Sequence, residues 1–213
     1  MMTNYFKHFV YLFVLLGIAS VFAGAYEDFF DAVNRDDGVA VQALVKRGFD
    51  PNSRNPVGQT ALHLALRDRS PRVVKALLDS PALDVNAHNA SGESPLMMAA
   101  LRGNLELARI LLERGAKVHQ DGWSPLHDAA TGPEPRLVAL LLDRGAPIDA
   151  LSVNKTTPLM MAAGYGAEDS LNLLLQKGAD LRLRNDLGLG PSDFARQGGR
   201  EALTKQLRDA ERR

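Results

Sequence analysis

The sequence predicts an all-α solenoid, built of short helix–turn–helix units that stack side by side. Three markers recur with a common period: a six-residue stretch whose clearest copy is residues 157–162, a Leu-Leu pair and a Gly-Ala pair. The steps between successive six-residue stretches are 34, 30, 33 and 33 residues. Three independent markers on one period indicate repeated structural units. The stretches begin at Thr60, Ser94, Ser124, Thr157 and Gly190.

Each position of the stretch has a physical role at the start of a helix. Ser or Thr at the first position can cap the helix through its side-chain oxygen. Pro at the next position suits the first helical turn, where its missing N–H is no loss. The Leu and Ala positions then fall on one face at helical spacing. The Leu-Leu pair ends a second helix, and the following Gly suits a left-handed C-terminal cap, as at Gly145 and Gly178.

A period near 33 residues with the pattern T-P-L-H-x-A is typical of ankyrin repeats. The chain carries this pattern as Ser124–Pro125–Leu126–His127 and, with Met in place of His, as Thr157–Pro158–Leu159–Met160. It therefore resembles an ankyrin-repeat protein over about residues 26–209. The resemblance implies an ankyrin-repeat solenoid of about six units, two of them capping units, joined by short β-turn or hairpin loops.

The repeat pattern also sets the expected boundaries. One ankyrin-repeat domain should follow a leader, and its terminal units should have polar outer faces, because a solenoid must end on surfaces that meet water. The expected segments are a signal peptide at 1–25 and a domain at 26–213, divided into an N-terminal cap unit at 26–54, repeats at 55–88, 89–119, 120–151 and 152–184, and a C-terminal cap unit at 185–209.

The amino-acid composition excludes several classes of function. The chain has 25 basic and 25 acidic residues and no cysteine. A neutral chain without a basic run is unsuited to nucleic acid, whose phosphates require clustered Lys and Arg. The lack of cysteine excludes disulfides and thiolate chemistry. No phosphate-binding loop or metal-ligating motif is present, so we expect no cofactor, no metal and no enzymatic activity. We also expect the protein to be a monomer.

The first 25 residues differ from the rest. Lys7 is followed by an uncharged run over residues 9–22 and by Ala-Gly-Ala at 23–25. This order is typical of a secretory signal cleaved after Ala25. The alternative is a retained membrane anchor through residues 9–26, since this run is close to the roughly 20 apolar residues of a spanning helix. The small-residue site favours cleavage, a periplasmic location and no membrane insertion afterwards.

Histidines offer the most obvious candidates for chemistry. His63 and His127 occupy the motif position of the family, where the imidazole bridges the Thr or Ser hydroxyl and nearby backbone; the structural role is favoured over catalysis. Met97 and Met160 replace His in the other repeats and should exchange that hydrogen bonding for apolar packing. His88 and His119 lie in neighbouring loops, but no third ligand follows at metal-binding spacing.

The resemblance also implies a partner-binding surface, because ankyrin repeats bind proteins through loop tips and the exposed side of their first helices. Trp123, the only Trp, is either a binding side chain or packs over the loop that the 30-residue step shortens. Arg69 stands where a Gly usually ends the first helix, which puts that turn in question. The matching positions are Gln59, Arg67, Asp68, Glu93, Leu101, Arg102, Trp123, Thr131, Val153, Asn154, Thr156 and Tyr165.

A leader followed by ankyrin repeats looks most like exported bacterial family members. The expected function is non-catalytic binding of another protein in the bacterial envelope, through the concave groove and loop tips. The alternative is a specific inhibitor or immunity protein that neutralises a toxin or an envelope enzyme. The residue pattern leaves both roles open, together with the identity of the partner.

Overall fold

The computed structural model describes residues 24–212, and this part of the chain is all-α, as the sequence predicts. Residues 24–34 are helical. The leader predicted at residues 1–25 lies almost entirely outside the described residues. The helices that follow are α2 (Gly38–Lys46), α3 (Ala61–Asp68), α4 (Pro71–Leu78), α5 (Pro95–Leu101), α6 (Leu105–Glu113), α7 (Pro125–Thr131), α8 (Pro135–Asp143), α9 (Pro158–Gly164), α10 (Glu168–Gln176), α11 (Pro191–Gln197) and α12 (Glu201–Glu211).

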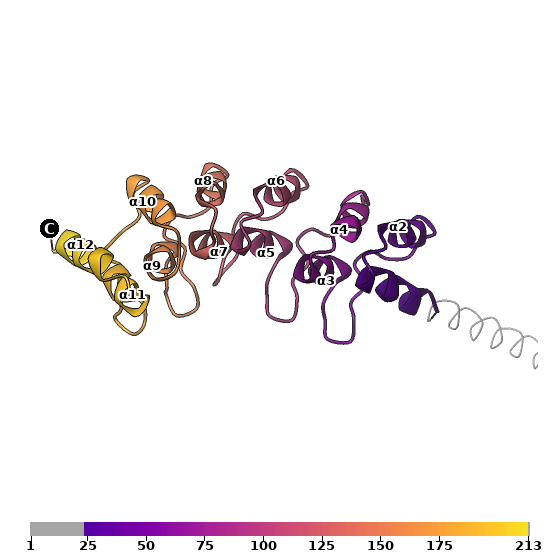
Figure 1. The fold of residues 1–213 in the computed structure, drawn as a ribbon, viewed down its shortest axis with the longest axis horizontal. Coiled ribbons are helices and arrows are strands. Elements are labelled where there is room, and N and C mark those ends of the chain that lie inside the picture. Colours follow the sequence, from indigo (N-terminus) through magenta and orange to yellow (C-terminus); the bar gives the residue numbers. More distant parts are fainter. Residues whose placement is uncertain (1–23, 213) are drawn as a thin grey trace, which may run out of the picture. The chain divides into compact units, whose positions relative to one another are not determined.

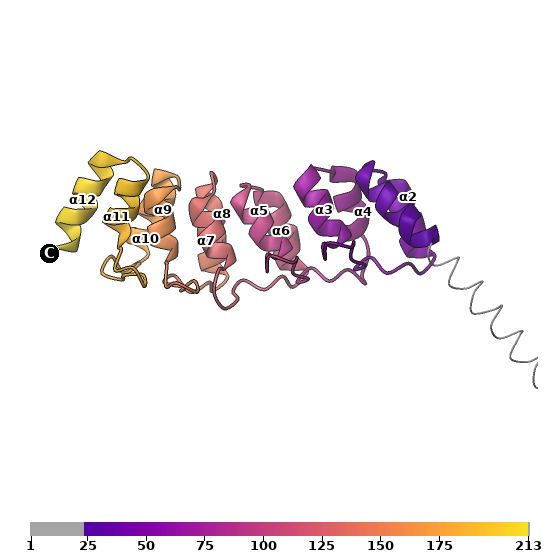
Figure 2. The same ribbon diagram turned by 90° about the horizontal axis from the view of Figure 1, so that it is seen from below.

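The chain divides into two compact units, one ending at Asp84 and the other beginning at Val85. In the first unit, α4 packs against both α2 and α3. In the second unit, the first helices of successive repeats pack in series: α5 against α7, α7 against α9 and α9 against α11. The second helices α6, α8 and α10 form a separate row behind them (Figures 1 and 2).

The apolar positions of the repeat form the core. The first leucine of each Leu-Leu pair is fully buried, and so is the leucine of each T-P-L-H-x-A motif. The predicted helix starts are also confirmed: Thr60, Ser94 and Thr157 each accept a hydrogen bond from the backbone N–H three residues later. Pro95 and Pro158 then occupy the first turn, where no N–H is needed.

The turns between helices use left-handed backbone where it was expected. Gly145 and Gly178 have φ values of +88° and +94°, and a Cβ atom added to either would meet no heavy atom within 4 Å outside its chain neighbours. Arg69 has φ 57° and ψ 48°, so this turn keeps the left-handed geometry without a glycine. Strain of about 1–2 kcal/mol is typical for a side chain in this region, and here the surrounding helices hold it in place.

A recurrent five-residue loop precedes most first helices. The backbone N–H of the opening residue donates to the carbonyl four residues later, as from Asn89 to Glu93 at 3.0 Å and from Asn185 to Leu189 at 3.0 Å. The Asn side chain accepts hydrogen bonds from two backbone N–H groups of the same loop. The predicted short turn loops are therefore present, and an asparagine side chain stabilises them.

Backbone-to-backbone approach fixes the spacing of the first helices in the second unit. A Cβ atom on Gly132 would lie 2.7 Å from the carbonyl oxygen of Ala100 in the preceding repeat. A Cβ on Gly166 would overlap the carbonyl oxygen of Ala130. These glycines are required by space, since Gly166 has no left-handed backbone.

Arg200 makes the equivalent contact at the C-terminal end with a side chain. Its Nη1 donates to the carbonyl oxygens of Ala162, Ala163 and Gly166 at 2.9, 3.0 and 3.1 Å. A guanidinium at the C-terminal end of α9 also suits the negative end of the helix dipole. At the far end of α12, Glu211 accepts hydrogen bonds from the backbone and hydroxyl of Ser192.

Substitutions at Gly166 and Gly145 should separate the cost of blocking the approach of two repeats from the cost of left-handed backbone strain. Gly166→Ala should lower the free energy of unfolding by about 3 kcal/mol or more, because Cβ overlaps a backbone carbonyl that cannot move alone. Gly145→Ala is the control; it should lose only about 1–2 kcal/mol from left-handed strain, since nothing blocks its Cβ. Urea unfolding measures both, and equal losses would show that inter-repeat approach is not the tighter constraint.

Candidate partner-binding surface

His127 joins two repeats inside the second unit. Its Nδ1 lies 2.9 Å from Ser124 Oγ, and its Nε2 lies 2.9 Å from the carbonyl oxygen of Thr156 in the next repeat. A carbonyl only accepts, so Nε2 carries the proton and Nδ1 accepts from Ser124. Burial lowers the pKa of His127, which keeps the ring neutral. The structural interpretation of this histidine is confirmed.

The equivalent positions of the other repeats keep the local contact between this residue and the capping Ser or Thr. His63 Nδ1 lies 2.8 Å from Thr60 Oγ1. Met97 and Met160 keep a weak version of the local contact, because their sulfur atoms accept from the backbone N–H groups of Ser94 and Thr157 at 3.4 and 3.5 Å. The expectation that methionine removes all of this hydrogen bonding was therefore too strong; both methionines are also buried.

Trp123 packs against its own repeat. Its ring stacks on His127 with centroids 4.9 Å apart, and its Nε1 donates to Asp128 Oδ1 at 2.9 Å. Gln120 closes the shortened loop by donating to the carbonyl oxygens of Trp123 and Gly92. Trp123 is half-buried. The buried part of its side chain packs on its own repeat, as the packing alternative expects, and the remainder is exposed.

Asp128 is the most perturbed acid in the described part of the chain. The residue is 7% exposed. Burial raises its pKa to about 7, the hydrogen bond from Trp123 lowers it, and the negative charge of Glu93 raises it further. The carboxyl is therefore close to half-protonated at neutral pH.

Three of the predicted partner-binding residues form one cluster in the first unit. Arg67 donates to both carboxylate oxygens of Asp68 at 2.7 and 2.9 Å and to Gln59 Oε1 at 3.1 Å. Both charged side chains are about half exposed. A planar, bidentate pair of this kind presents a fixed polar surface.

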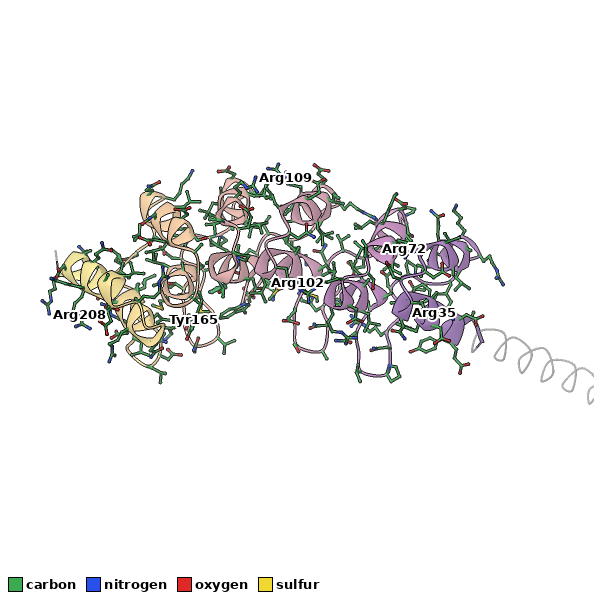
Figure 3. The ribbon with its side chains drawn as sticks, in the orientation of Figure 1. Arg35, Arg72, Arg102, Arg109, Tyr165 and Arg208 are labelled. Carbon is green, nitrogen blue, oxygen red and sulfur yellow. The ribbon has the colours of Figure 1, made fainter. Side chains whose placement is uncertain are left out.

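The second unit holds the other predicted residues. Leu101, Tyr165 and Val153 are 45%, 55% and 92% exposed. Arg102 and Tyr165 directly follow helices α5 and α9 as their C-terminal caps, and Figure 3 labels both near these helices. Arg102 and Asn154 are also exposed, and Glu93, Trp123 and Thr131 are half-buried.

Thr156 does not belong to this surface. It is 3% exposed, its N–H donates to Ser152 Oγ at 2.9 Å, and its carbonyl oxygen faces His127. The expectation that its side chain contacts a partner was wrong, because the loop folds back and uses this residue to join two repeats. Asn154, two residues earlier, is exposed and remains a candidate.

Sequence reasoning missed three positions on the side of the first helices that carries Leu101, Thr131 and Tyr165; two are half-buried methionines and the third is the buried Asp128. Met98, Asp128 and Met161 each lie four residues after the capping Ser or Thr, in α5, α7 and α9. Three or four residues later come Leu101, Thr131 and Tyr165, which fall on the same helical face. The shared spacing after the cap is the signal that could have found them. We call these six residues the inner face.

A second feature lies in the first unit, beside the irregular loop after α4. A pocket of about 430 Å³ has Ser80, Pro81 and Ala82 on one side and Phe49 on another. The loop at residues 80–84 falls within the 34-residue step of the repeat, and part of it borders this pocket. Its lining is mainly apolar.

Residues 24–212 contain neither a candidate metal site nor a candidate membrane span. In that range, no group of three or more His, Cys, Asp or Glu side chains is placed to hold a metal ion. None of the helices in the same range combines the length and apolar character that crossing a bilayer requires.

Comparison with known families agrees with this architecture. The family described as "Ankyrin repeats (3 copies)" matches residues 29–121 and 117–185. This chain belongs to the ankyrin-repeat family. The matched residues include both units of the structure.

Three of the relatives are human proteins of different kinds. The chain is 40% identical over 179 residues to "NF-kappa-B inhibitor epsilon", covering 78% of this chain and 36% of that protein. It is 38% identical over 152 residues to "B-cell lymphoma 3 protein", covering 68% and 34%. With "Transient receptor potential cation channel subfamily A member 1" it shares 29% over 161 residues, covering 70% and 14%. The ankyrin-repeat chain thus spans about a third or less of these relatives, and none of them supports a bacterial origin.

Replacement of the perturbed acid should change how stability depends on pH. An unfolded aspartate titrates near 3.9, whereas Asp128 titrates at about 7 in the fold. Its protonated form therefore gives stability at low pH that is lost as pH rises toward 7. Relative to Asp128→Asn, the wild-type chain should lose about 4 kcal/mol across this window, at about 1.36 kcal/mol per unit.

Urea unfolding of both chains at several pH values between about 4 and 8 measures this difference. The Asn side chain still accepts the hydrogen bond from Trp123, so the comparison isolates the charge. Parallel pH profiles for the two chains would contradict the assignment.

Proposed function

We propose that this ankyrin-repeat chain is a non-catalytic module that binds a partner protein through its inner face and the adjoining loop tips. The observation that supports this proposal is the exposure of Leu101 and Tyr165 at the ends of α5 and α9. A tyrosine such as Tyr165 is of the kind that dominates the binding energy of protein interfaces, and an exposed leucine adds apolar area beside it.

A catalytic role has little support in the same region. Ser124 and His127 lie within hydrogen-bonding distance, as a nucleophile and base would. Both are buried, however, so a substrate has no access to the pair, and the second ring nitrogen donates to the carbonyl oxygen of Thr156 in the next repeat. The pair therefore serves the joint between repeats.

Two settings extend the proposal. The order of residues 1–25 supports export through a cleaved signal peptide, with the mature protein acting in a bacterial periplasm, or in the alternative anchored through residues 9–26. N-terminal sequencing of protein from the exported fraction should find Tyr26 first, and an intact Met1 in washed membranes would overturn cleavage.

The second candidate is a specific inhibitor, which is supported by the similarity to a protein named as an NF-kappa-B inhibitor.

A charge substitution on the inner face tests the proposed surface. The double variant Leu101→Glu and Tyr165→Glu should reduce capture of the partner from the native cell fraction by more than about tenfold, because both exposed contacts become charged. The control is Asn172→Glu and Gln176→Glu on α10, which adds the same two charges to exposed positions outside the inner face.

The tagged full-length chain is used as bait, and captured proteins are quantified by mass spectrometry. The control variant should capture the same partner as the wild type. Loss of capture only in the α10 variant would place the surface on the second helices instead.

A further inference from the structure

Asp128 has a carboxylate oxygen that the described chain does not use. Trp123 donates to Oδ1, and Oδ2 makes no hydrogen bond or ion pair with the described residues. Within residues 24–212, Ser170 Oγ is the buried side-chain polar atom without a partner, so Oδ2 of Asp128 reaches the surface. It does so from a residue that is otherwise almost fully buried.

The neighbouring positions are apolar. Met98 in α5 and Met161 in α9 occupy the same helical position as Asp128 in α7, and both are half-buried. Because α7 packs between α5 and α9, the acid lies between two thioether side chains on the inner face. Thioether side chains adapt readily to the shape of a partner.

The fold itself does not require an acid at this position. Asn would accept the hydrogen bond of Trp123 equally well, without the unfavourable burial of charge. A buried carboxylate with one open oxygen is stabilised when an opposite charge arrives. Among the described residues, the charge that acts on the pKa of Asp128 is that of Glu93, which is acidic, and the neighbouring His127 ring is neutral.

We propose that Asp128 binds a cationic Arg or Lys side chain of the partner protein, whose aliphatic stem passes between Met98 and Met161. This inference rests on the proposed function and specifies the chemistry of the partner. A guanidinium could also lie against the exposed part of the Trp123 ring, since cations favour aromatic faces. A metal ion is a poorer occupant, because a single carboxylate provides too few ligands.

Trp123 gives a direct readout, because it is the only tryptophan in the chain and its indole N–H bonds Asp128. The probe is the peptide acetyl-Leu-Arg-Leu-amide, titrated into the full-length chain while the indole N–H signal is followed by NMR. Acetyl-Leu-citrulline-Leu-amide is the matched neutral peptide. The Arg peptide should shift the signal saturably, and the citrulline peptide should bind at least tenfold more weakly.

The variant Asp128→Asn keeps the acceptor for Trp123 and should bind the Arg peptide at least tenfold more weakly than the wild type. Asp169→Asn, at an exposed position of α10, is the control and should bind as the wild type does. No indole shift at peptide concentrations on the order of 10 mM, or equal binding by both variants, would overturn the proposal.

Native-partner capture separates this inference from the proposed function. If capture is lost in the Leu101→Glu and Tyr165→Glu variant but unchanged in Asp128→Asn, the inner face binds and the cation site is wrong. If only Asp128→Asn loses both capture of the partner and binding of the Arg peptide, the cation site stands. Leu101 and Tyr165 are then not contacts of the partner.

Discussion

The second unit depends on the close approach of one first helix to the next. Gly166 lies so near the carbonyl oxygen of Ala130 that no side chain fits between them, and His127 spans the same pair of repeats to the carbonyl of Thr156. The first contact joins backbone to backbone and the second joins a side chain to backbone, so both fix spacing more firmly than apolar side chains alone. The fully buried leucines then stabilise a geometry that the glycines permit.

The fixed spacing of the first helices also determines which side chains make up the inner face. Helices held at a fixed spacing present one position per repeat at regular intervals, and the residue four after each cap is such a position. In α5 and α9 it is methionine, and in α7 it is Asp128. A change of one side chain in one repeat therefore alters the chemistry of the surface without altering the fold, as expected for a repeat protein that binds by its exposed positions.

Much of the fold could be predicted from the sequence because its signals are local. The capping Ser or Thr, the proline after it and the glycine after the second helix each act within a few residues, and the structure confirms them. The close-approach role of Gly166 could not be predicted, because it depends on a carbonyl more than thirty residues earlier. Arg69 shows the opposite case: the local signal is absent, and packing still holds the turn.

The candidate surface was less predictable. Exposed Leu101 and Tyr165 follow from helical position, whereas burial of Thr156 and the bond between Trp123 and Asp128 depend on how loops fold back. An isolated Asp beside a motif histidine gives no warning in sequence that its pKa is about 7. Desolvation by neighbouring repeats causes that shift, and one-dimensional spacing does not describe it.

The central claim is that a partner protein covers the inner face, and hydroxyl-radical footprinting of the full-length chain with its captured partner tests it most directly. Met98, Met161 and Tyr165 are reactive side chains with exposed surface on that face. We predict that the partner lowers their oxidation severalfold, while exposed side chains of α6, α8 and α10 are labelled as in the free chain. Protection confined to α6, α8 and α10, with Met98, Met161 and Tyr165 oxidised as before, would contradict the account.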